Sequence, residues 1–252
     1  MRHAVIGGSL LFLLLTACNG EQVPDCFQNS GELVREELAL EPFDRLIVYE
    51  LVKVVLQFGP EQKVELETGE YLRDEVEAVV TDGRLELRNH NNCNLFRPYG
   101  QTTFYITVPE LKEIRSSTGY PIVSEGSLPF EALSLYSESF NNLDTGTTDG
   151  SFDLDLQVQS LTIVANGIAY FKLRGSATTM RLTIAAGDSR IDAKDLTAQR
   201  LIVNHRGSND MLVTPVQSIQ GVIRGTGDVL CFSRPDTVVV DILYRGQLLF
   251  RD

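Results

Sequence analysis

The chain has 252 residues, of which 34 are acidic and 22 basic, and its formal net charge is −12 at pH 7. The apolar content of 43% is ordinary for a globular protein. Such an acidic chain repels nucleic-acid phosphates and anionic lipid headgroups, so we exclude nucleic acid as a partner and expect no charge-driven membrane binding.

The start of the chain predicts export and lipidation. A positive start at Arg2 precedes an apolar run over residues 4–15, which is too short to span a bilayer as a stable helix. The run ends in Leu15-Thr16-Ala17-Cys18, which resembles the lipobox of bacterial lipoproteins. We expect residues 1–17 to be a signal peptide and Cys18 to carry the only membrane anchor, a lipid. An ordinary signal peptide with a chance cysteine is the less favoured alternative.

Without residues 1–17, the length of the remaining chain suits one all-β domain. Residues 18–41 are polar and acidic, and we predict that they form the lipidated N-terminus and a tether to a single domain over residues 42–252. Three further cysteines would enter an oxidising compartment, where thiols tend to pair. We favour a disulfide between Cys26 and Cys93, because each lies in a loosely patterned polar segment; it would contribute roughly 4 kcal/mol. Cys231 is then expected to be a buried free thiol.

The region before residue 110 predicts antiparallel or short-range β-structure. Residues 46–58 form one or two strands, and residues 63–68 alternate strictly between apolar and polar side chains. Residues 71–75 suit a single helical turn. Asp82-Gly83 predicts a hairpin turn between strands, and a further strand ends before Pro109.

From residue 111 a repeat develops, irregular at first and interrupted by a polar excursion over residues 145–151. Four regular units follow between residues 161 and 232, and Ile163, Ile184, Val203 and Ile223 are predicted to occupy the same place in each. Such a repeat predicts stacked coils of about 20 residues, each pairing its strands with the next coil. Residues 237–250 are expected to close the stack as a C-terminal hairpin.

The chain resembles the head GIN domain family, a domain of unknown function in adhesin-like lipoproteins of the Bacteroidetes type. The features that carry the resemblance are the lipobox, Cys26-Phe27, the entry strand Phe43–Tyr49, the Asp-Gly hairpin, the Asn-x-Cys-Asn turn and the Leu-x-Ile coils. It extends over residues 27–250. The resemblance implies a right-handed parallel β-helix and supplies no catalytic residues. The serine and glycine coil turns usual in the family are replaced here, at Ala165-Asn166-Gly167 for example.

Candidate chemical groups are few. His3, His90 and His205 are too few for a multi-histidine site, and we expect His205 to decorate a coil turn. Carboxylates that could bind calcium or serve a glycosidase form two clusters: Asp144, Asp149, Asp153 and Asp155; Asp188, Asp192 and Asp195. The calcium-binding nonapeptide pattern is missing, so we interpret both clusters as solvated turns and expect no metal or cofactor.

These observations predict an exported, lipid-anchored envelope protein that acts as an adhesin or recognition module without catalytic activity. The expected partner is an envelope or extracellular protein or glycan. Asn19 in place of aspartate gives a weak preference for the outer membrane. Two alternatives stay open, a structural or assembly factor and a polysaccharide lyase or hydrolase. The enzyme would use basic residues near the regular coils: Arg190, Lys194, Arg200 and Arg206.

Overall fold

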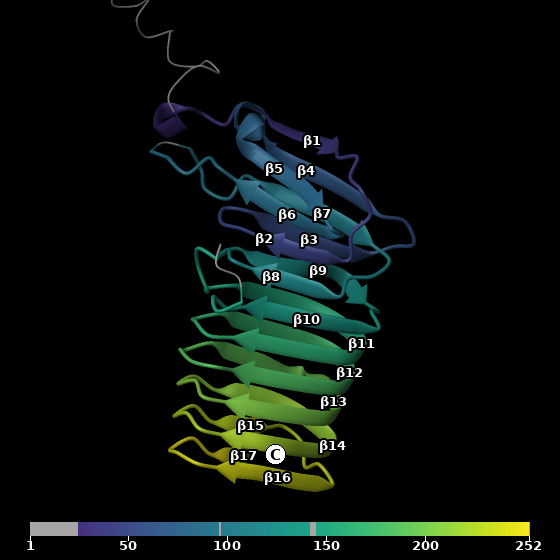
Figure 1. Ribbon diagram of the computed structural model, residues 1–252, viewed down its shortest axis with the longest axis vertical. Coiled ribbons are helices and arrows are strands. Elements are labelled where there is room, and N and C mark those ends of the chain that lie inside the picture. The colour runs from purple at the N-terminus through teal and green to yellow at the C-terminus, as the bar shows by residue number, and fades with distance from the viewer. Residues whose placement is uncertain (1–24, 96, 142–144, 252) are drawn as a thin grey trace, which may run out of the picture.

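The computed structural model describes residues 25–95, 97–141 and 145–251 and shows an elongated all-β protein (Figure 1). The all-β class is therefore confirmed. The N-terminal strands are β1 (Leu33–Glu37), β2 (Arg45–Val48), β3 (Lys53–Phe58), β4 (Lys63–Gly69), β5 (Val76–Thr81), β6 (Arg84–Asn89), β7 (Thr103–Val108), β8 (Glu113–Ser116) and β9 (Pro121–Leu128). The remaining strands are β10 (Ala132–Ser137), β11 (Ser151–Ala165), β12 (Tyr170–Ile184), β13 (Arg190–His205), β14 (Met211–Ile223), β15 (Val229–Cys231), β16 (Thr237–Ile242) and β17 (Leu248–Phe250). Two short 3-10 helices, η1 (Asp25–Phe27) and η2 (Glu70–Glu75), complete the elements.

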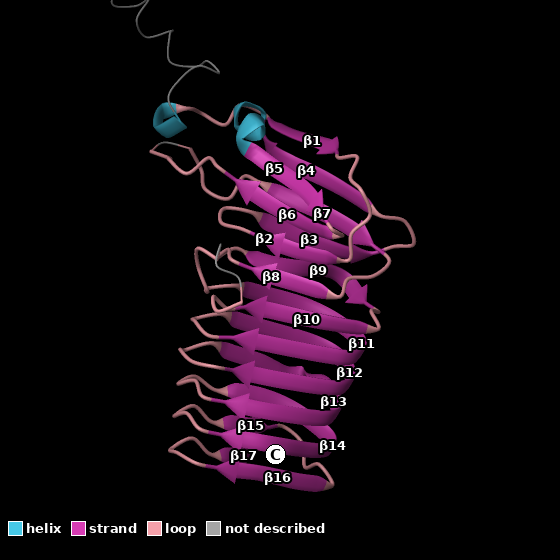
Figure 2. Ribbon diagram, in the orientation of Figure 1, coloured by secondary structure: helices cyan, strands magenta, loops and turns pink. Residues whose placement is uncertain are grey.

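The strands belong to one curled, mixed sheet whose pairings form two ladders along the long axis (Figure 2). The β16 ladder joins β6, β2, β8, β10, the C-terminal halves of β11 to β14, and β16. The β17 ladder joins β4, β7, β3, β9, the N-terminal halves of β11 to β14, β15 and β17. Each of the long strands β11 to β14 therefore contributes to both ladders.

The core lies between the ladders because alternate residues of every strand turn inward. In β11 the buried positions include Phe152, Leu161 and Ile163, while the side chains that alternate with the buried ones are partly or fully exposed. Phe152 stacks on Phe171 of the next strand, with ring centroids 4.8 Å apart. Burial of these side chains supplies the main stabilisation of the stack, at about 25 cal/mol per Å² of apolar surface.

The predicted alignment of the repeats is wrong by two positions at two coils. Ile163 pairs with Leu182, not Ile184, and Val203 pairs with Gly221, not Ile223. The true register therefore runs from position 163 to 182, then to 203 and then to 221. A shift of two preserves the inward side of a strand, so the apolar pattern cannot distinguish the two registers.

Gly221 occupies the position equivalent to Val203, and the sequence does not reveal this because a side chain cannot fit there. Its φ is +136°, and an added Cβ would lie 1.9 Å from the carbonyl oxygen of Val203. The coil therefore lacks an apolar side chain at the equivalent position. Ile223, two residues later, is the next apolar residue on the same side of the strand, and the sequence pattern therefore favours it as the equivalent position.

The N-terminal region keeps the predicted local features but not the predicted strand directions. η2 covers the expected helical turn, and β5 and β6 form the expected hairpin, with Asp82 and Gly83 at φ 52° and 72°. However, β2 pairs in parallel with β6 and β8, and β3 pairs in parallel with β7 and β9. Alternation reveals which side of a strand is buried but not the direction of its neighbour.

The two ends of the chain differ from expectation. β16 pairs in parallel with β14, and β17 with β15, so the last strands extend the two ladders and the predicted C-terminal hairpin is wrong. The short Arg245-Gly246 turn suggested a hairpin, but each strand instead pairs with the preceding coil. Within the predicted tether, β1 pairs antiparallel with β4. His3, residues 1–17 and Cys18, as well as Asp144, lie outside the described residues.

Candidate ligand-binding site

A pocket is lined by the segment between β6 and β7 and by residues that include Leu51, in the turn between β2 and β3. The segment between β6 and β7 lies on the left of Figure 1. The structure joins Cys26 to Cys93 in this segment, and their Cα atoms are 4.5 Å apart. The buried Arg97 donates from Nη2 to the carbonyl oxygens of Asn91 at 3.1 Å and Cys93 at 2.9 Å. The Asn94 side chain brackets Arg97, because it contacts both the backbone N–H and the carbonyl oxygen of that residue. The segment is therefore held by a covalent bond and a buried cation.

A row of hydrogen-bonded polar side chains adjoins the pocket, and Asn89 and Thr102 of this row also line it. The Thr102 hydroxyl contacts that of Thr68 at 2.9 Å and accepts from Nδ2 of Asn89 at 3.0 Å. Asn89 Nδ2 also reaches the carbonyl oxygen of Leu51 at 3.3 Å. Leu51 has a φ of +65°, which is unfavourable for a residue with a branched side chain. The row thus fixes both strand ends and the strained turn around the pocket.

Two residues that line the pocket, Asn91 and Gln101, each have a buried side-chain oxygen, Oδ1 and Oε1 respectively, that lacks a hydrogen-bond partner among the described residues. Asn91 is only 5% exposed. Its Nδ2 donates to the Leu72 carbonyl at 3.0 Å and to Oδ1 of Asn89 at 2.7 Å, which fixes the amide so that Oδ1 is the unpaired atom. A buried acceptor without a donor costs about 1–3 kcal/mol, so both oxygens favour a ligand that carries hydrogen-bond donors.

The rim of the pocket offers a flat aromatic surface. Tyr99 is 72% exposed, and its hydroxyl donates to the Asn94 carbonyl at 3.3 Å. The cavity measures about 40 Å³, little more than the volume of one water molecule in the liquid, about 30 Å³. The cavity therefore admits a hydroxyl or another small polar substituent. The rest of such a ligand would lie on the rim, against Tyr99.

The predicted acidic clusters are largely neutralised or solvated. Asp153 forms ion pairs with Lys172 and Arg174, and Asp192 pairs with Lys194. The pKa of Asp153 is lowered because its hydrogen bonds to Arg174 and Lys172 outweigh the opposing effect of burial. The other predicted acidic positions have ordinary settings: Asp149 accepts from Thr147, Asp188 accepts from Ser208, Asp195 contacts Lys194, and Asp155 is half-buried. Within the described residues, no three histidine, cysteine or acidic side chains are grouped to hold a metal ion.

The predicted basic residues do not converge on a cleft. Arg190 approaches Asn209 at 3.4 Å, Arg200 donates to Thr179 at 3.1 Å, and Arg206 is exposed on a coil turn. Lys194 is occupied by Asp192 and Asp195. The residues considered for a lyase or hydrolase thus lie along the stack with separate surroundings.

His205 and Cys231 are both core residues. The expectation that His205 decorates a turn is wrong, because its side chain is fully buried at the end of β13. Burial lowers the pKa of His205 and favours the neutral ring, against opposing contributions from the Asn209 backbone, Asp210 and Asp228. Cys231 is a buried free thiol, as predicted, and burial raises its pKa to about 11.

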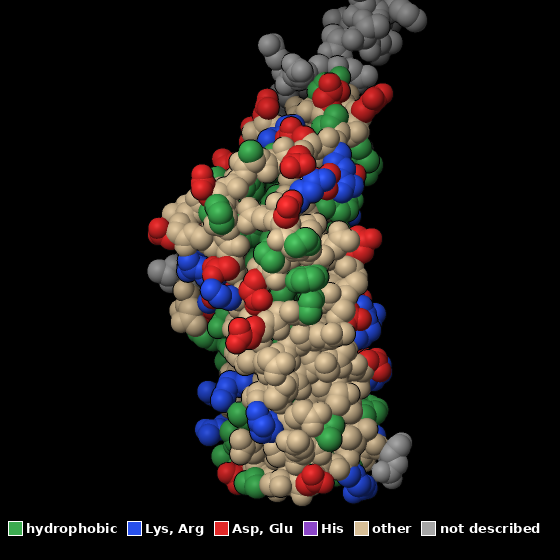
Figure 3. All heavy atoms as spheres, turned by 90° about the vertical axis from the view of Figure 1, so that its right-hand side faces the viewer, with side chains coloured by type: hydrophobic (Ala, Val, Ile, Leu, Met, Phe, Trp, Pro, Cys, Tyr) green, Lys and Arg blue, Asp and Glu red, His purple; other side chains and the backbone are tan. Residues whose placement is uncertain are grey.

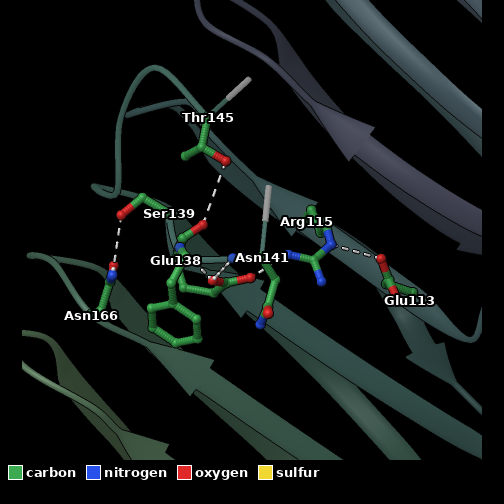
Figure 4. A network of polar contacts seen from close by, with 8 residues as sticks. Glu113, Arg115, Glu138, Ser139, Asn141, Thr145 and Asn166 are labelled. Carbon is green, nitrogen blue, oxygen red and sulfur yellow. Dashed lines mark hydrogen bonds and ion pairs between the residues drawn. The ribbon is translucent and has the colours of Figure 1, made fainter. Parts of the chain in front are cut away.

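The turn after β10 is held by the buried carboxylate of Glu138, whose carbonyl oxygen also accepts a hydrogen bond from Thr145 at 3.4 Å (Figure 4). Glu138 forms an ion pair with Arg115 and accepts hydrogen bonds from the backbone N–H groups of Phe140 and Asn141. Arg115 also pairs with Glu113 and lies over the ring of Tyr136. Both oxygens of Glu138 are engaged, so we assign this network a structural role.

The side of the stack in Figure 3 shows few charged side chains over its middle. A shallow groove is lined by residues of successive coils together with Glu110 and Glu131. Its lining includes Gln157, Gln159, Ser176, Thr178 and Gln199 from successive coils. Thr178 donates to Oε1 of Gln159 at 2.8 Å, so part of this surface is already satisfied. We regard the groove as secondary to the pocket, which has buried unpaired acceptors.

Sequence patterns did not reveal the pocket, although the asparagine-rich turn at residues 89–94 lies within it. That run was a usable signal, because asparagine amides provide both donors and acceptors. Leu51, Leu72 and Gln101 reach the pocket only through the fold. Their separation along the chain hides the site from sequence patterns.

Comparisons with known proteins place the chain in a family. Residues 42–235 match the model of the putative auto-transporter adhesin, head GIN domain family, and the chain belongs to that family. None of the proteins with curated functions matches it significantly.

Solved structures share the fold at low sequence identity. A putative adhesin from Bacteroides fragilis NCTC 9343 aligns with a TM-score of 0.75 and 17% identity, over 88% of this chain and 99% of that one. A putative adhesin from Parabacteroides merdae ATCC 43184 aligns at 0.59 and 13%, over 88% and 97%. A putative lipid-binding protein from Parabacteroides distasonis ATCC 8503 aligns at 0.58 and 16%, over 88% and 98%. In the part of our structure that is described, no helix has the length and apolar character needed to cross a membrane.

Proposed function

We propose that the protein is a non-catalytic recognition module that binds a glycan through the pocket beside Tyr99. The observation that carries this proposal is the pair of buried, unpaired acceptors, Asn91 Oδ1 and Gln101 Oε1. Sugar hydroxyls supply donors to such oxygens, and an exposed aromatic ring packs against the apolar face of a sugar. The lining residues are mainly amides and apolar groups and include no carboxylate or histidine among the described residues, which supports binding over acid–base catalysis.

A glycan array with purified variants tests this function. We expect the wild-type chain from Asn19 onward to bind a defined set of neutral glycans, and Tyr99→Ala to weaken that binding about tenfold. Tyr170→Ala is the matched control, because Tyr170 is a partly exposed tyrosine on the regular coils. Equal losses of glycan binding in Tyr99→Ala and Tyr170→Ala would overturn the assignment to this pocket. Unchanged binding in Tyr99→Ala would overturn it as well. Release of cleaved products would favour the polysaccharide lyase or hydrolase instead.

We also propose that the protein is exported and held at the envelope by a lipid on Cys18, with the outer membrane as the preferred location. The lipobox, the preceding apolar run and a disulfide that needs an oxidising compartment support this location. Labelled palmitate should enter the wild-type chain and be absent from Cys18→Ala. Equal labelling of both chains would contradict the anchor.

We infer that the curled sheet is a right-handed parallel β-helix in which each coil crosses from the β17 ladder to the β16 ladder. The register from Ile163 through Leu182 and Val203 to Gly221 and the dual pairing of β11 to β14 support this path. Right-handed crossovers between parallel strands are strongly preferred. A crystal structure that traces the chain around each coil tests it, and a left-handed path would contradict it.

A further inference from the structure

Among the described residues, no strand covers the core at the C-terminal end of the stack. Val238 and Ile242 of β16 stand in register with the buried Ile219 and Ile223 of β14, so they occupy inward positions. They are nevertheless exposed, by 44% and 50%. β16 lies at the bottom of the stack in Figure 2, with no strand below it among the described residues.

Both last strands also present a free edge. Within the described part of the chain, β16 pairs with β14 and β17 with β15, and neither has a second partner strand. Residues 237–242 read Thr-Val-Val-Val-Asp-Ile, a β-branched run that favours strand pairing. An exposed apolar edge of this kind is a template for another strand, and folded proteins usually cover it.

We propose that this end binds the same end of a second copy and forms a two-fold symmetric dimer. A partner must offer two strand edges at the spacing of β16 and β17, with apolar side chains between them. A second copy of the chain has the same two strand edges at the same spacing. In a two-fold symmetric dimer, the same surface of each copy forms the interface. This inference does not depend on the proposed glycan pocket. Most of that pocket is lined by the segment between β6 and β7, and these two strands lie toward the other end of the stack (Figure 1).

The charge distribution also favours contact between copies at this end. Residues 229–252 carry three arginines and three aspartates, a net charge of 3 − 3 = 0, whereas the whole chain carries −12. Two copies that approached through other surfaces would experience their shared negative charge. The nearly neutral end reduces that repulsion where the apolar residues are exposed.

The strand sequence also limits the register. In an antiparallel pair, directly opposed residues point to the same side. The two-fold axis must therefore lie midway between one residue of β16 and the same residue of the second copy, and we name each register by that residue. An axis at Val239 places Asp241 opposite Thr237, and an axis at Val240 places it opposite Val239. An axis at Asp241 would oppose two like charges, so we expect a centre at Val239 or Val240.

Sedimentation equilibrium of the chain from Asn19 onward tests the dimer. We expect twice the chain mass for the wild-type protein and at least a tenfold weaker association for Val238→Lys, because Val238 occupies an inward apolar position in either register. The matched control is Val79→Lys, because Val79 is a 53% exposed valine on β5, and β5 pairs only with β6 among the described strands. This control should dimerise like the wild type.

Disulfide trapping distinguishes the registers. An axis at Val239 predicts oxidative cross-linking of V239C with itself, and an axis at Val240 predicts cross-linking of V239C with D241C. A monomeric wild type up to about 100 μM, well above a micromolar dissociation constant, would overturn the proposal. A dimer insensitive to Val238→Lys would overturn it as well, and so would open-ended polymers, which a closed two-fold interface excludes.

Discussion

The irregular region from β1 to β9 and the regular region from β10 to β17 use the same stacking rule with different results. In the regular region, successive long strands pair along most of their length, and the hollows there are broad and shallow. In the irregular region, antiparallel strands, a disulfide and a long connection interrupt the ladders and enclose a pocket. Regular stacking gives a continuous body with shallow surfaces, and departures from regular stacking create a pocket.

The largest predicted effect is on the regular core. Phe171→Ala removes one ring of the buried stack with Phe152, and we expect about 3–5 kcal/mol of lost unfolding free energy in a denaturant titration. Phe140→Ala, at an exposed phenylalanine, is the control and should stay within about 0.5 kcal/mol. A small effect of Phe171→Ala would mean that the stack does not carry the stability of the fold.

The second effect should be confined to the irregular region. The double variant Cys26→Ser, Cys93→Ser removes the cross-link, and we expect a loss of about 2–4 kcal/mol. Hydrogen exchange should rise around residues 89–102, while β12 and β13 keep their protection. Faster exchange throughout the regular coils would contradict this division of the molecule.

The third effect is a pH dependence that arises in the regular core. Burial lowers the folded-state pKa of His205 below its unfolded value of about 6.5, so the unfolded chain binds this proton more tightly. The fold should lose up to about 2 kcal/mol as the pH falls from about 7.5 to about 5, and His205→Leu should reduce that loss. The lowered pKa of Asp153 acts in a different window, because its contribution is lost only near and below about pH 4. Thermal melts of the wild type, His205→Leu and the control His90→Gln over this pH range measure the contribution of His205. Identical pH profiles in all three proteins would contradict it.

The smallest effect concerns the pocket itself. Gln101→Met replaces an unpaired buried acceptor with an apolar chain of similar length, and we expect about 1 kcal/mol of added stability. The same variant should bind glycan several-fold more weakly, because it loses an acceptor for the ligand. A variant that is both less stable and fully active would contradict the role given to Gln101.

Sequence patterns predicted the features that depend on local chemistry. The strand positions, the Asp82-Gly83 turn and the buried Cys231 all follow from side-chain alternation and turn preference. The coil register could not be predicted, because Ile184 and Leu182 face the same side of their strand. His205 was misplaced because a histidine beside a glycine turn resembles a surface residue, whereas its position in the strand turns it inward.

The candidate site required the three-dimensional fold. Asn91 belonged to a visible asparagine run, but its unpaired oxygen results from the hydrogen bonds that it makes to Leu72 and Asn89. The strained Leu51 gives no sequence signal at all. Pairing of distant segments determines such contacts, and neither composition nor periodicity encodes them locally.

Hydrogen exchange of the wild-type chain, with and without the strongest neutral glycan from the array, would show directly where recognition occurs. Binding in the pocket predicts slower exchange in residues 89–102 and in the turn at Leu51, with the regular coils unchanged. Protection confined to residues 151–231 would contradict the pocket and place recognition on the regular stack.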